Sequence, residues 1–435
     1  MLEVDRLLNV LRRGFLSAKE IQRELGISQP AMSRLVREAG SRLIRIGRSV
    51  ATRYALPREI PGLGQHAPIF QVDEQGQLTD HGMLYFLAGG GTWLERSSGD
   101  GQLFPGLPPF VDDMRPQGYI GRGFPTLYPE LRLPGRITDW NEDHQLMALA
   151  RRGEDCVGNL IIGEESLNRF LARRMEPYSR ADYPGLASNV LAGQPGSSAG
   201  GEHPKFAIAA GERHLLVKFA SGDGAVADRW RDLLVAEHLA LEVLRVAGVP
   251  TPHSEWFDHE GGRYLELERF DRVGRQGRYG IISLFALNNH YFGNYPDNWS
   301  QASHRITVEP TLSLTLADVD RVVWLDTFGD LIGNTDRHFG NLSFFAEEAR
   351  KLTLTPTPVY DMLPMVFAPA GTSLVERRFN PKPPTVLNRR IWHEVAIHAL
   401  QYWARLGDEG KLSDGFRRIS ADCRVTLARL IDERS

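Results

Sequence analysis

A short polar segment within residues 331–345, LIGNTDRHFGNLSFF, contains side chains whose types and spacing could carry chemistry. Asp336 stands five residues before Asn341, and a second carboxylate, Asp361, follows in the segment PTPVYDMLP. A carboxylate can orient a hydroxyl group and accept its proton. Carboxylate and amide oxygens are also ligands that Mg²⁺ accepts. The three residues therefore predict a proton-accepting group next to a metal site.

The step from Asp336 to Asn341 equals the step from the catalytic Asp to the Asn in the kinase pattern H-R-D-x-x-x-x-N. In that pattern the Asp is the catalytic base and the Asn holds Mg²⁺. Asp361 would then take the place of the aspartate of the DFG motif, although no DFG is present. The alternative is that Asp336 and Arg337 form a surface ion pair and that Asp361 is a turn residue.

The elements that must position these residues can be read from hydrophobic periodicity. An apolar run over 322–332 predicts a helix before the loop, and runs over 342–345 and 352–355 predict two strands after it. A polar turn at 347–351 would join the strands into a hairpin. The hairpin would bring Asp361 back to the loop.

A segment of small residues, GQPGSSAGGEHPK over 193–205, precedes a strand-like HLLVKF that contains Lys218. Small residues let backbone N–H groups approach phosphate oxygens, and a lysine on the next strand can neutralise them. The match to the Walker pattern fails, so a flexible linker is the alternative. The candidate phosphate-binding residues of this segment are Ser198, Gly200, Gly201 and Lys205.

A helical period over 232–246 places Glu237 early in a helix, where it either pairs with Lys218 or is a solvated surface residue. The segment YLELERF, 264–270, alternates apolar and polar residues as an edge strand does. It leads into the polar DRVGRQGR. A hinge between two lobes is expected there, with adenine contacts from Glu268 and Phe270.

The N-terminal region is basic, whereas the rest of the chain is acidic. Residues 1–56 hold eleven Lys and Arg against five Asp and Glu, a net charge of +6, and the total of −3 leaves −9 for the remainder. Ser17 and Glu20 form a capping box, and Gly26 separates two helical patterns. A hairpin wing is expected over 43–56. This pattern predicts a winged helix-turn-helix that binds duplex DNA.

The expected DNA contacts lie on the third helix and the wing: Gln29, Ser33, Arg34, Arg37, Arg45 and Arg48. The alternative is a small helical cap or dimerisation element whose arginines are merely solvated.

Length and composition bound the remaining possibilities. The chain has 435 residues, 42% hydrophobic and 24% charged, so two or three globular domains are expected. Cys156 and Cys423 stand far apart, which argues against a disulfide scaffold or a zinc module. No apolar run is long enough to span a bilayer, so we expect no membrane partner and a cytoplasmic protein.

With SSAGGEHPK, VKF, ERFDR, GNTDRHFGN and YDMLP in this order, the chain resembles the HipA-like serine/threonine kinases over roughly residues 60–430. The fused helix-turn-helix is similar to the YjjJ-type branch of that family. Segments within 108–163 also resemble the family's small N-terminal subdomain. The resemblance implies an α+β, two-lobed kinase-like fold with a mostly helical C-lobe. The expected domains are 1–57, 58–270 and 271–435.

The resemblance also implies a function and residue roles. It implies ATP and Mg²⁺ as cofactors, Asp336 as the catalytic base, and Asn341 and Asp361 as metal ligands. Lys218 matches the phosphate-binding lysine, and Ser198 matches a serine that the family autophosphorylates. Family members are toxins of toxin–antitoxin pairs, and some phosphorylate aminoacyl-tRNA synthetases. A DNA-binding module in the same chain leaves open whether a separate antitoxin partner exists.

Two functions from different classes remain after this reading. The first is an active ATP- and Mg²⁺-dependent protein kinase with a DNA-binding module in the same chain. The second is a DNA-binding transcriptional regulator whose kinase-like body senses a ligand without phosphate transfer. The presence of Lys218, Asp336, Asn341 and Asp361 together favours the kinase.

Overall fold

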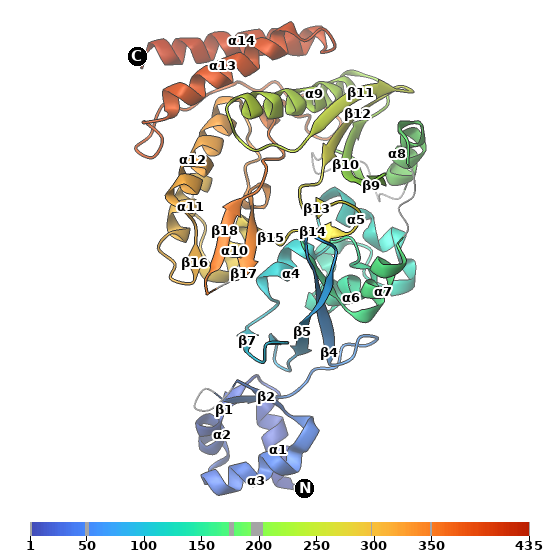
Figure 1. The fold of residues 1–435 in the computed structure, drawn as a ribbon, viewed down its shortest axis with the longest axis vertical. Helices are drawn as coiled ribbons and strands as arrows, with labels where there is room; N and C mark the ends of the chain where they lie inside the picture. Colours follow the sequence, from blue (N-terminus) through green and yellow to red (C-terminus); the bar gives the residue numbers. More distant parts are fainter. Residues whose placement is uncertain are drawn as a thin grey trace. The chain divides into compact units, whose positions relative to one another are not determined.

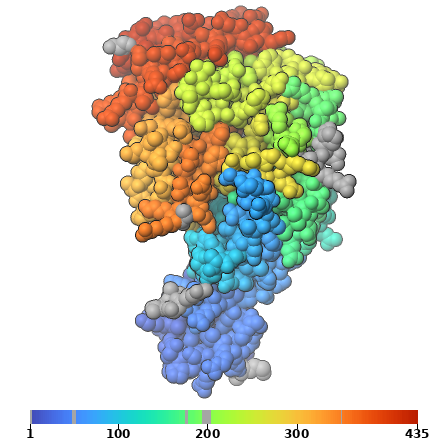
Figure 2. All heavy atoms as spheres, viewed as in Figure 1, coloured from blue at the N-terminus to red at the C-terminus, as the bar shows by residue number. Residues whose placement is uncertain are grey.

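The computed structural model describes residues 2–47, 52–173, 178–192, 203–296, 298–348 and 350–434. The chain forms two compact units, Met1–Pro116 with Glu130–Arg173, and Gln117–Pro129 with Arg174–Ser435. Figure 1 shows the elements of each unit, and Figure 2 shows their atoms as spheres. The architecture is α+β, as the sequence predicts. The domain boundary expected after residue 57 falls inside the first unit.

The first unit begins with three helices and a small antiparallel sheet of strand order β1-β3-β2. These elements are α1 (Leu2–Leu11), β1 (Leu16–Ser17), α2 (Ala18–Leu25), α3 (Gln29–Ala39), β2 (Ile44–Ile46) and β3 (Arg53–Ala55). The predicted capping box is present, since Ser17 accepts from the backbone N–H of Glu20 and Glu20 accepts from that of Ser17. Gly26 ends α2 in the left-handed region at φ 67°. Helices α2 and α3 and strands β2 and β3 lie within the residues where the sequence predicts two helices and a hairpin wing.

A second part of the first unit is a five-stranded antiparallel sheet of order β7-β6-β5-β4-β8. Its strands are β4 (His66–Val72), β5 (Leu78–Phe86), β6 (Thr92–Arg96), β7 (Gly101–Phe104) and β8 (Leu160–Ile162). The helices of this part are α4 (Pro109–Met114), α6 (Glu142–Arg152) and α7 (Glu164–Ala172). Ile69, Leu84 and Phe86 of the strands pack with Leu146 and Leu149 of α6 into one apolar core.

The wing and this sheet share a small core of their own. Ile46 and Ala55 of the wing pack with Leu87 and Trp93. The backbone also approaches closely at Gly89, where a side-chain Cβ would lie 2.6 Å from the backbone of Arg13. The N-terminal three-helix part is therefore packed against the sheet that follows it.

The second unit contains a four-stranded antiparallel sheet of order β11-β12-β10-β9. Its strands are β9 (Lys205–Ala210), β10 (Arg213–Ala220), β11 (Ser254–His259) and β12 (Gly262–Glu268). The helices of this region are α5 (Gly118–Leu127), α8 (Tyr183–Ala192) and the long α9 (Ala225–Val246), which contacts β10, β11 and β12. Leu233, Leu234 and Leu241 of α9 are fully buried.

The expectation of an edge strand over 264–270 is wrong, because β12 lies inside the sheet between β11 and β10. Glu266, one of the alternating polar residues, is only 4% exposed. Its carboxylate accepts hydrogen bonds from Arg180 at 2.8 and 3.0 Å and from the Tyr183 hydroxyl at 2.8 Å. The polar positions of this strand thus include a buried and fully partnered carboxylate.

The rest of the second unit is mostly helical. Its helices are α10 (Leu284–Tyr291), α11 (Trp299–Ile306), α12 (Leu316–Leu331), α13 (Trp392–Asp408) and α14 (Asp414–Asp432). Its short strands are β13 (Arg272–Val273), β14 (Gly277–Arg278), β15 (Ile281–Ser283), β16 (Leu312–Ser313), β17 (Ser343–Glu348) and β18 (Leu352–Pro356). The predicted hairpin is confirmed, with Phe345 opposite Thr355 across β17 and β18. One large apolar core joins α9 to these helices.

Among the described residues, every helix is too short or too polar to cross a membrane.

Candidate active site

Lys218 lies near the end of β10, and its ammonium group contacts two carboxylates. Its Nζ donates to Oε1 and Oε2 of Glu237 on α9 at 2.6 and 2.7 Å, and it also pairs with Oδ1 of Asp361. The Lys218 side chain is 3% exposed and that of Glu237 is 0% exposed, whereas that of Asp361 is 29% exposed. The sheet and the helix therefore bury the Lys218–Glu237 ion pair. The Asp361 carboxylate, in contrast, stays partly accessible to solvent.

Burial and neighbouring charges set the protonation of this cluster. Burial alone would lower the pKa of the Lys218 ammonium group, but Asp361 and Glu237 raise it above its usual range. Burial alone would raise the pKa of Asp361, but Lys218 and Lys205 hold it well below its usual range. Burial raises the pKa of Glu237, and Lys218 opposes this effect. Lys218 is therefore cationic and Asp361 anionic at neutral pH.

Asn334, which the sequence analysis did not single out, joins Asp361 to the polar loop. Its side-chain Nδ2 donates to the backbone oxygen of Asp361 at 3.0 Å, and its Oδ1 accepts from the backbone N–H of Asp336 at 3.1 Å. The residue is 1% exposed. Asp361 itself has φ 52°, a left-handed backbone that is uncommon for a non-glycine residue. The hydrogen bond from Asn334 helps to hold this conformation.

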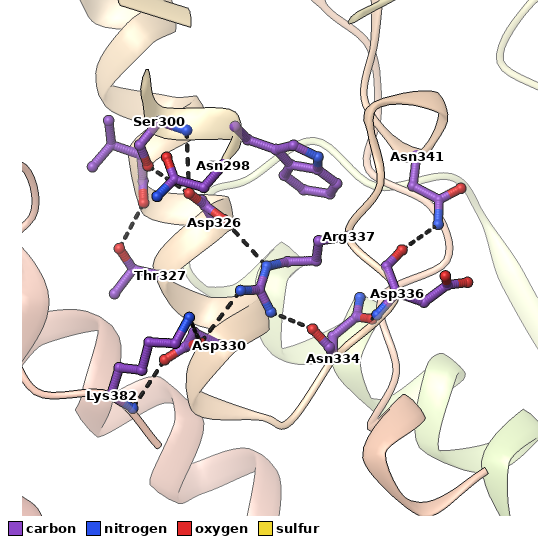
Figure 3. A network of polar contacts seen from close by, with 12 residues as sticks. Asn298, Ser300, Asp326, Thr327, Asp330, Asn334, Asp336, Arg337, Asn341 and Lys382 are labelled. Carbon is purple, nitrogen blue, oxygen red and sulfur yellow. Dashed lines mark hydrogen bonds and ion pairs between the residues drawn. The ribbon is translucent and has the colours of Figure 1, made fainter. Parts of the chain in front are cut away.

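Asn341 completes the connection between the predicted residues. Its Nδ2 donates to the backbone oxygen of Asp336 at 2.8 Å, as Figure 3 shows. An unbroken series of polar contacts thus runs from Glu237 through Lys218, Asp361 and Asn334 to Asp336 and Asn341. Asn341 is 8% exposed and Asp336 is an exposed residue.

Arg337 ties the loop to the end of α12. Its Nε donates to Asp326 at 3.2 Å, its Nη2 donates to Asp330 at 3.3 Å, and its Nη1 donates to the backbone oxygen of Asn334 (Figure 3). Arg337 thus pairs with two carboxylates of α12. The loop is thereby held in a defined position.

The residues expected to contact adenine lie at the end of the sheet. Glu268 ends β12, its side chain is 42% exposed, and it pairs with Arg213 at 3.4 Å. Phe270 is half-buried and packs on Tyr360 and Phe345, with ring centres 5.7 and 6.2 Å apart. Both residues thus lie at or just after the end of β12.

The small-residue segment before β9 is described only in part. Lys205 begins β9 and stands directly opposite Lys218 in the sheet register. His203 is buried against Trp230, with ring centres 4.4 Å apart. Burial and the charge of Lys218 lower the pKa of His203 to about 3, so its ring is neutral at neutral pH. The predicted Ser198, Gly200 and Gly201 lie outside the described residues.

The expected DNA-binding side chains of α3 lie on its solvent face. Gln29, Ser33, Arg34 and Arg37 are exposed, while Met32, Leu35 and Ala39 of the same helix are buried. Arg45 on β2 is also exposed, and Arg48 lies outside the described residues.

Sequence reasoning missed three site residues: Asn334, and the two partners of Arg337, Asp326 and Asp330. The nearest sequence signal for Asn334 is its place two residues before Asp336, the spacing at which an Asn side chain accepts a hydrogen bond from the backbone. No sequence signal pairs Arg337 with Asp326 and Asp330, because that contact needs the end of α12 to lie beside the loop.

The fold of this chain is similar to that of a solved HipA structure. One similar solved structure is the Shewanella oneidensis MR-1 toxin–antitoxin complex of HipA, HipB and operator DNA. The match covers 84% of this chain and 97% of the chain in that structure. The TM-score is 0.51 and the sequence identity 15%, so this similarity shows a shared fold.

Sequence comparison gives a closer relationship. The model of the HipA-like C-terminal domain matches residues 197–423, and that of the YjjJ-like toxin middle domain matches residues 63–171. Toxin YjjJ of Escherichia coli strain K12 is 35% identical over 434 residues, which covers 96% of each chain. The chain therefore belongs to the HipA-like family, in its YjjJ-like toxin branch, as the sequence motifs predict.

Proposed function

We propose that the protein is an ATP- and Mg²⁺-dependent serine/threonine protein kinase with a DNA-binding module in the same chain. The observation that carries this proposal is the series of contacts that joins the Lys218–Glu237 pair to Asp361 and the Asp336 loop. A lysine, two carboxylates and a nearby base are the groups that phosphoryl transfer requires.

The residues present fit a magnesium–nucleotide complex. Asp361 and Asn341 offer oxygen atoms, the ligand type that Mg²⁺ prefers, and Mg²⁺ usually binds through one or two carboxylates together with substrate phosphates. The Asp361 carboxylate is anionic and 29% exposed, so a cation can reach it. When bound, the metal would offset the charge that develops on the transferred phosphoryl group.

Each side chain would have a separate task. Lys218, which Glu237 orients, would neutralise phosphate oxygens, and Lys205 on the neighbouring strand would add positive charge. Asp336 would orient a serine or threonine hydroxyl of the acceptor and accept its proton. Glu268 and Phe270, at the end of β12, would border the adenine ring.

Phosphate transfer distinguishes this proposal from the rival, a DNA-binding regulator whose kinase-like body only senses a ligand. The full chain would be incubated with radiolabelled ATP and Mg²⁺, alone and with a cell extract. We expect Asp336→Ala to abolish transfer while nucleotide binding persists, because this residue acts on the acceptor. Asp361→Ala should also weaken Mg²⁺-dependent nucleotide binding. Asp414→Ala, an exposed change on α14, is the control.

Wild-type transfer rates in both site variants would show that the kinase assignment is wrong. Nucleotide binding without any transfer in the wild-type protein would favour the regulator.

DNA binding by residues 1–57 is supported by the net positive charge of this region and the exposed polar face of α3. We expect the affinity of the full chain for duplex DNA to fall as salt rises, with a log–log slope of about −0.9 per neutralised phosphate. Arg37→Ala should make the slope less steep by about one such step. Arg424→Ala, an exposed arginine on α14, should leave it unchanged. An affinity that does not depend on salt contradicts the proposal.

The family suggests further features that extend this proposal. Autophosphorylation of Ser198 would place a charge of about −1.5 to −2 in the segment expected to approach ATP phosphates, and nucleotide affinity should fall. A growth-inhibiting toxin or stress regulator that phosphorylates a translation component, such as an aminoacyl-tRNA synthetase, is the corresponding cellular role. Operator DNA and a separate antitoxin are the partners of the Shewanella HipA, and here the antitoxin stays an open part of the proposal.

A further inference from the structure

A cavity of about 670 Å³ opens beside the Asp336 loop within the second unit. Its walls come from α12, the loop itself and an irregular segment, residues 376–391, that we call the strap. Asp336 lines this cavity, so an acceptor bound here would lie next to the proposed catalytic base. Cavities that bind ligands commonly enclose a few hundred to a thousand Å³.

The strap is fixed to the body of the unit at several points. The backbone N–H of Lys382 donates to Asp330 at 2.9 Å, and the indole of Trp392 donates to the backbone oxygen of Lys382 at 3.1 Å. Asn388 donates to the hydroxyl of Thr327 at 3.1 Å. Hydrogen bonds therefore hold this wall of the cavity in place.

Two acidic groups of the cavity wall, Asp326 and Asp330, are used within the protein. Asp326 accepts from the backbone N–H and the hydroxyl of Ser300 at 3.1 and 2.7 Å, and from Arg337 at 3.2 Å. Asp330 pairs with Arg337 and with Lys382, as Figure 3 shows. These two carboxylates have little capacity left to bind a positively charged acceptor.

One basic group of the strap, Arg378, is not used in this way. Arg378 lines the cavity, is exposed, and has no hydrogen-bond or ion-pair partner among the residues that the structure describes. The Lys382 side chain is 71% exposed and pairs with Asp330 at 3.4 Å. The strap as a whole holds five Lys and Arg against one Glu. Apart from Asp336, which is assigned to the reacting hydroxyl, the charge that the cavity offers to an incoming segment is therefore positive.

We propose that this cavity binds an acidic segment of the acceptor polypeptide and that Arg378 is a specificity-determining residue. The inference rests on the proposed kinase function and adds the chemical class of its acceptor. An Asp or Glu close in sequence to the phosphorylated serine or threonine would pair with the Arg378 guanidinium, which suits carboxylates geometrically. The hydroxyl would then lie at Asp336.

The test uses the full chain and fluorescent peptides that carry one central serine flanked by Glu, Ala or Lys residues. We expect the Glu-flanked peptide to bind about tenfold more tightly than the Ala-flanked one, the usual scale for one charge-assisted contact. Arg378→Ala should remove this difference, and Arg378→Glu should make the Lys-flanked peptide the tighter ligand. Arg377→Ala, a neighbouring exposed arginine that does not line the cavity, is the matched control.

The same peptides in a transfer assay separate this inference from the kinase proposal. If they are phosphorylated, Arg378→Ala should raise the KM for the Glu-flanked peptide about tenfold without changing the KM for ATP. Acidic peptides that bind through Arg378 but are never phosphorylated would support the acceptor site and count against kinase activity. Equal binding of all three peptides, or equal effects of Arg377→Ala and Arg378→Ala, would overturn the inference.

Discussion

The ammonium group of Lys218 occupies a position where a charge is costly to bury. Its side chain is 3% exposed and lies between Glu237 and Asp361. A buried ion pair often contributes no more stability than apolar residues of the same volume would, because both charges lose their hydration. Stability is therefore a poor explanation for this cluster. A site that must present a fixed positive charge to phosphates is a better one.

His203 offers a prediction at the same scale. The folded protein keeps its ring neutral, since burial and Lys218 lower its pKa to about 3, whereas an unfolded chain binds a proton near pH 6.5. Stability should therefore fall as the pH drops below about 6.5, by about 2 kcal/mol at pH 5 from this residue alone. Urea unfolding of the wild-type protein and of His203→Gln at pH 7 and pH 5 measures it. The variant should lose about 2 kcal/mol less than the wild type, and parallel losses would contradict the assignment.

At the scale of elements, the loop between α12 and β17 depends on side chains that bond to its backbone. Asn334 holds the backbone N–H of Asp336 and the backbone oxygen of Asp361, which are separated by 25 positions in the chain. Arg337 holds the same loop to the end of α12. The geometry of the proposed base and metal ligand thus has one common support in Asn334.

Asn334→Ala should therefore lower both activity and stability. It leaves the backbone N–H of Asp336 and the backbone C=O of Asp361 without this partner, a cost of about 1–3 kcal/mol for each group that water cannot reach. We expect kcat for phosphate transfer to fall at least about tenfold, because a small misplacement of catalytic groups costs that much or more. Asn334→Asp is the informative comparison, since it keeps the acceptor for Asp336 and loses the donor to Asp361. Unchanged kcat in both variants would show that the loop is held by other contacts.

At the scale of the whole molecule, each unit has its own apolar cores. The large core of the second unit joins α9 to the C-terminal helices, and separate cores fill the helix-turn-helix and the five-stranded sheet of the first unit. Helix α5 belongs to the second unit although both flanking segments belong to the first. The two proposed ligands, nucleotide and DNA, therefore engage residues of different units.

This division predicts where each ligand should stabilise the chain. A ligand at about a hundred times its Kd stabilises the part that binds it by about 2.7 kcal/mol. With Mg²⁺ and ATP we expect slower hydrogen exchange of β10 and α9 amides and little change in α3. Duplex DNA should protect α2 and α3 and leave β10 unchanged. Equal protection of α3 and β10 by ATP would contradict separate sites and indicate strong coupling of the units.

Local patterns in the sequence determined several features without the fold. The Ser17–Glu20 capping box and the β17–β18 hairpin follow from residues that are close in the chain. The order of short motifs in the chain identified the family. The spacing of Asp336 and Asn341 could be recognised because both residues lie within one loop. The roles of these residues stay proposals that the experiments above test.

Contacts between distant residues were decided only by the tertiary structure. The alternation in β12 could not distinguish an edge strand from an interior one, because the partner of Glu266 is Arg180, 86 positions away. Asn334 could not be recognised as a link to Asp361 until the hairpin had brought them together. The same holds for the strap, in which Arg378 lines the cavity and Lys382 is bound to Asp330, 52 positions earlier. Local preferences predict elements, but only packing decides which distant polar groups find a partner.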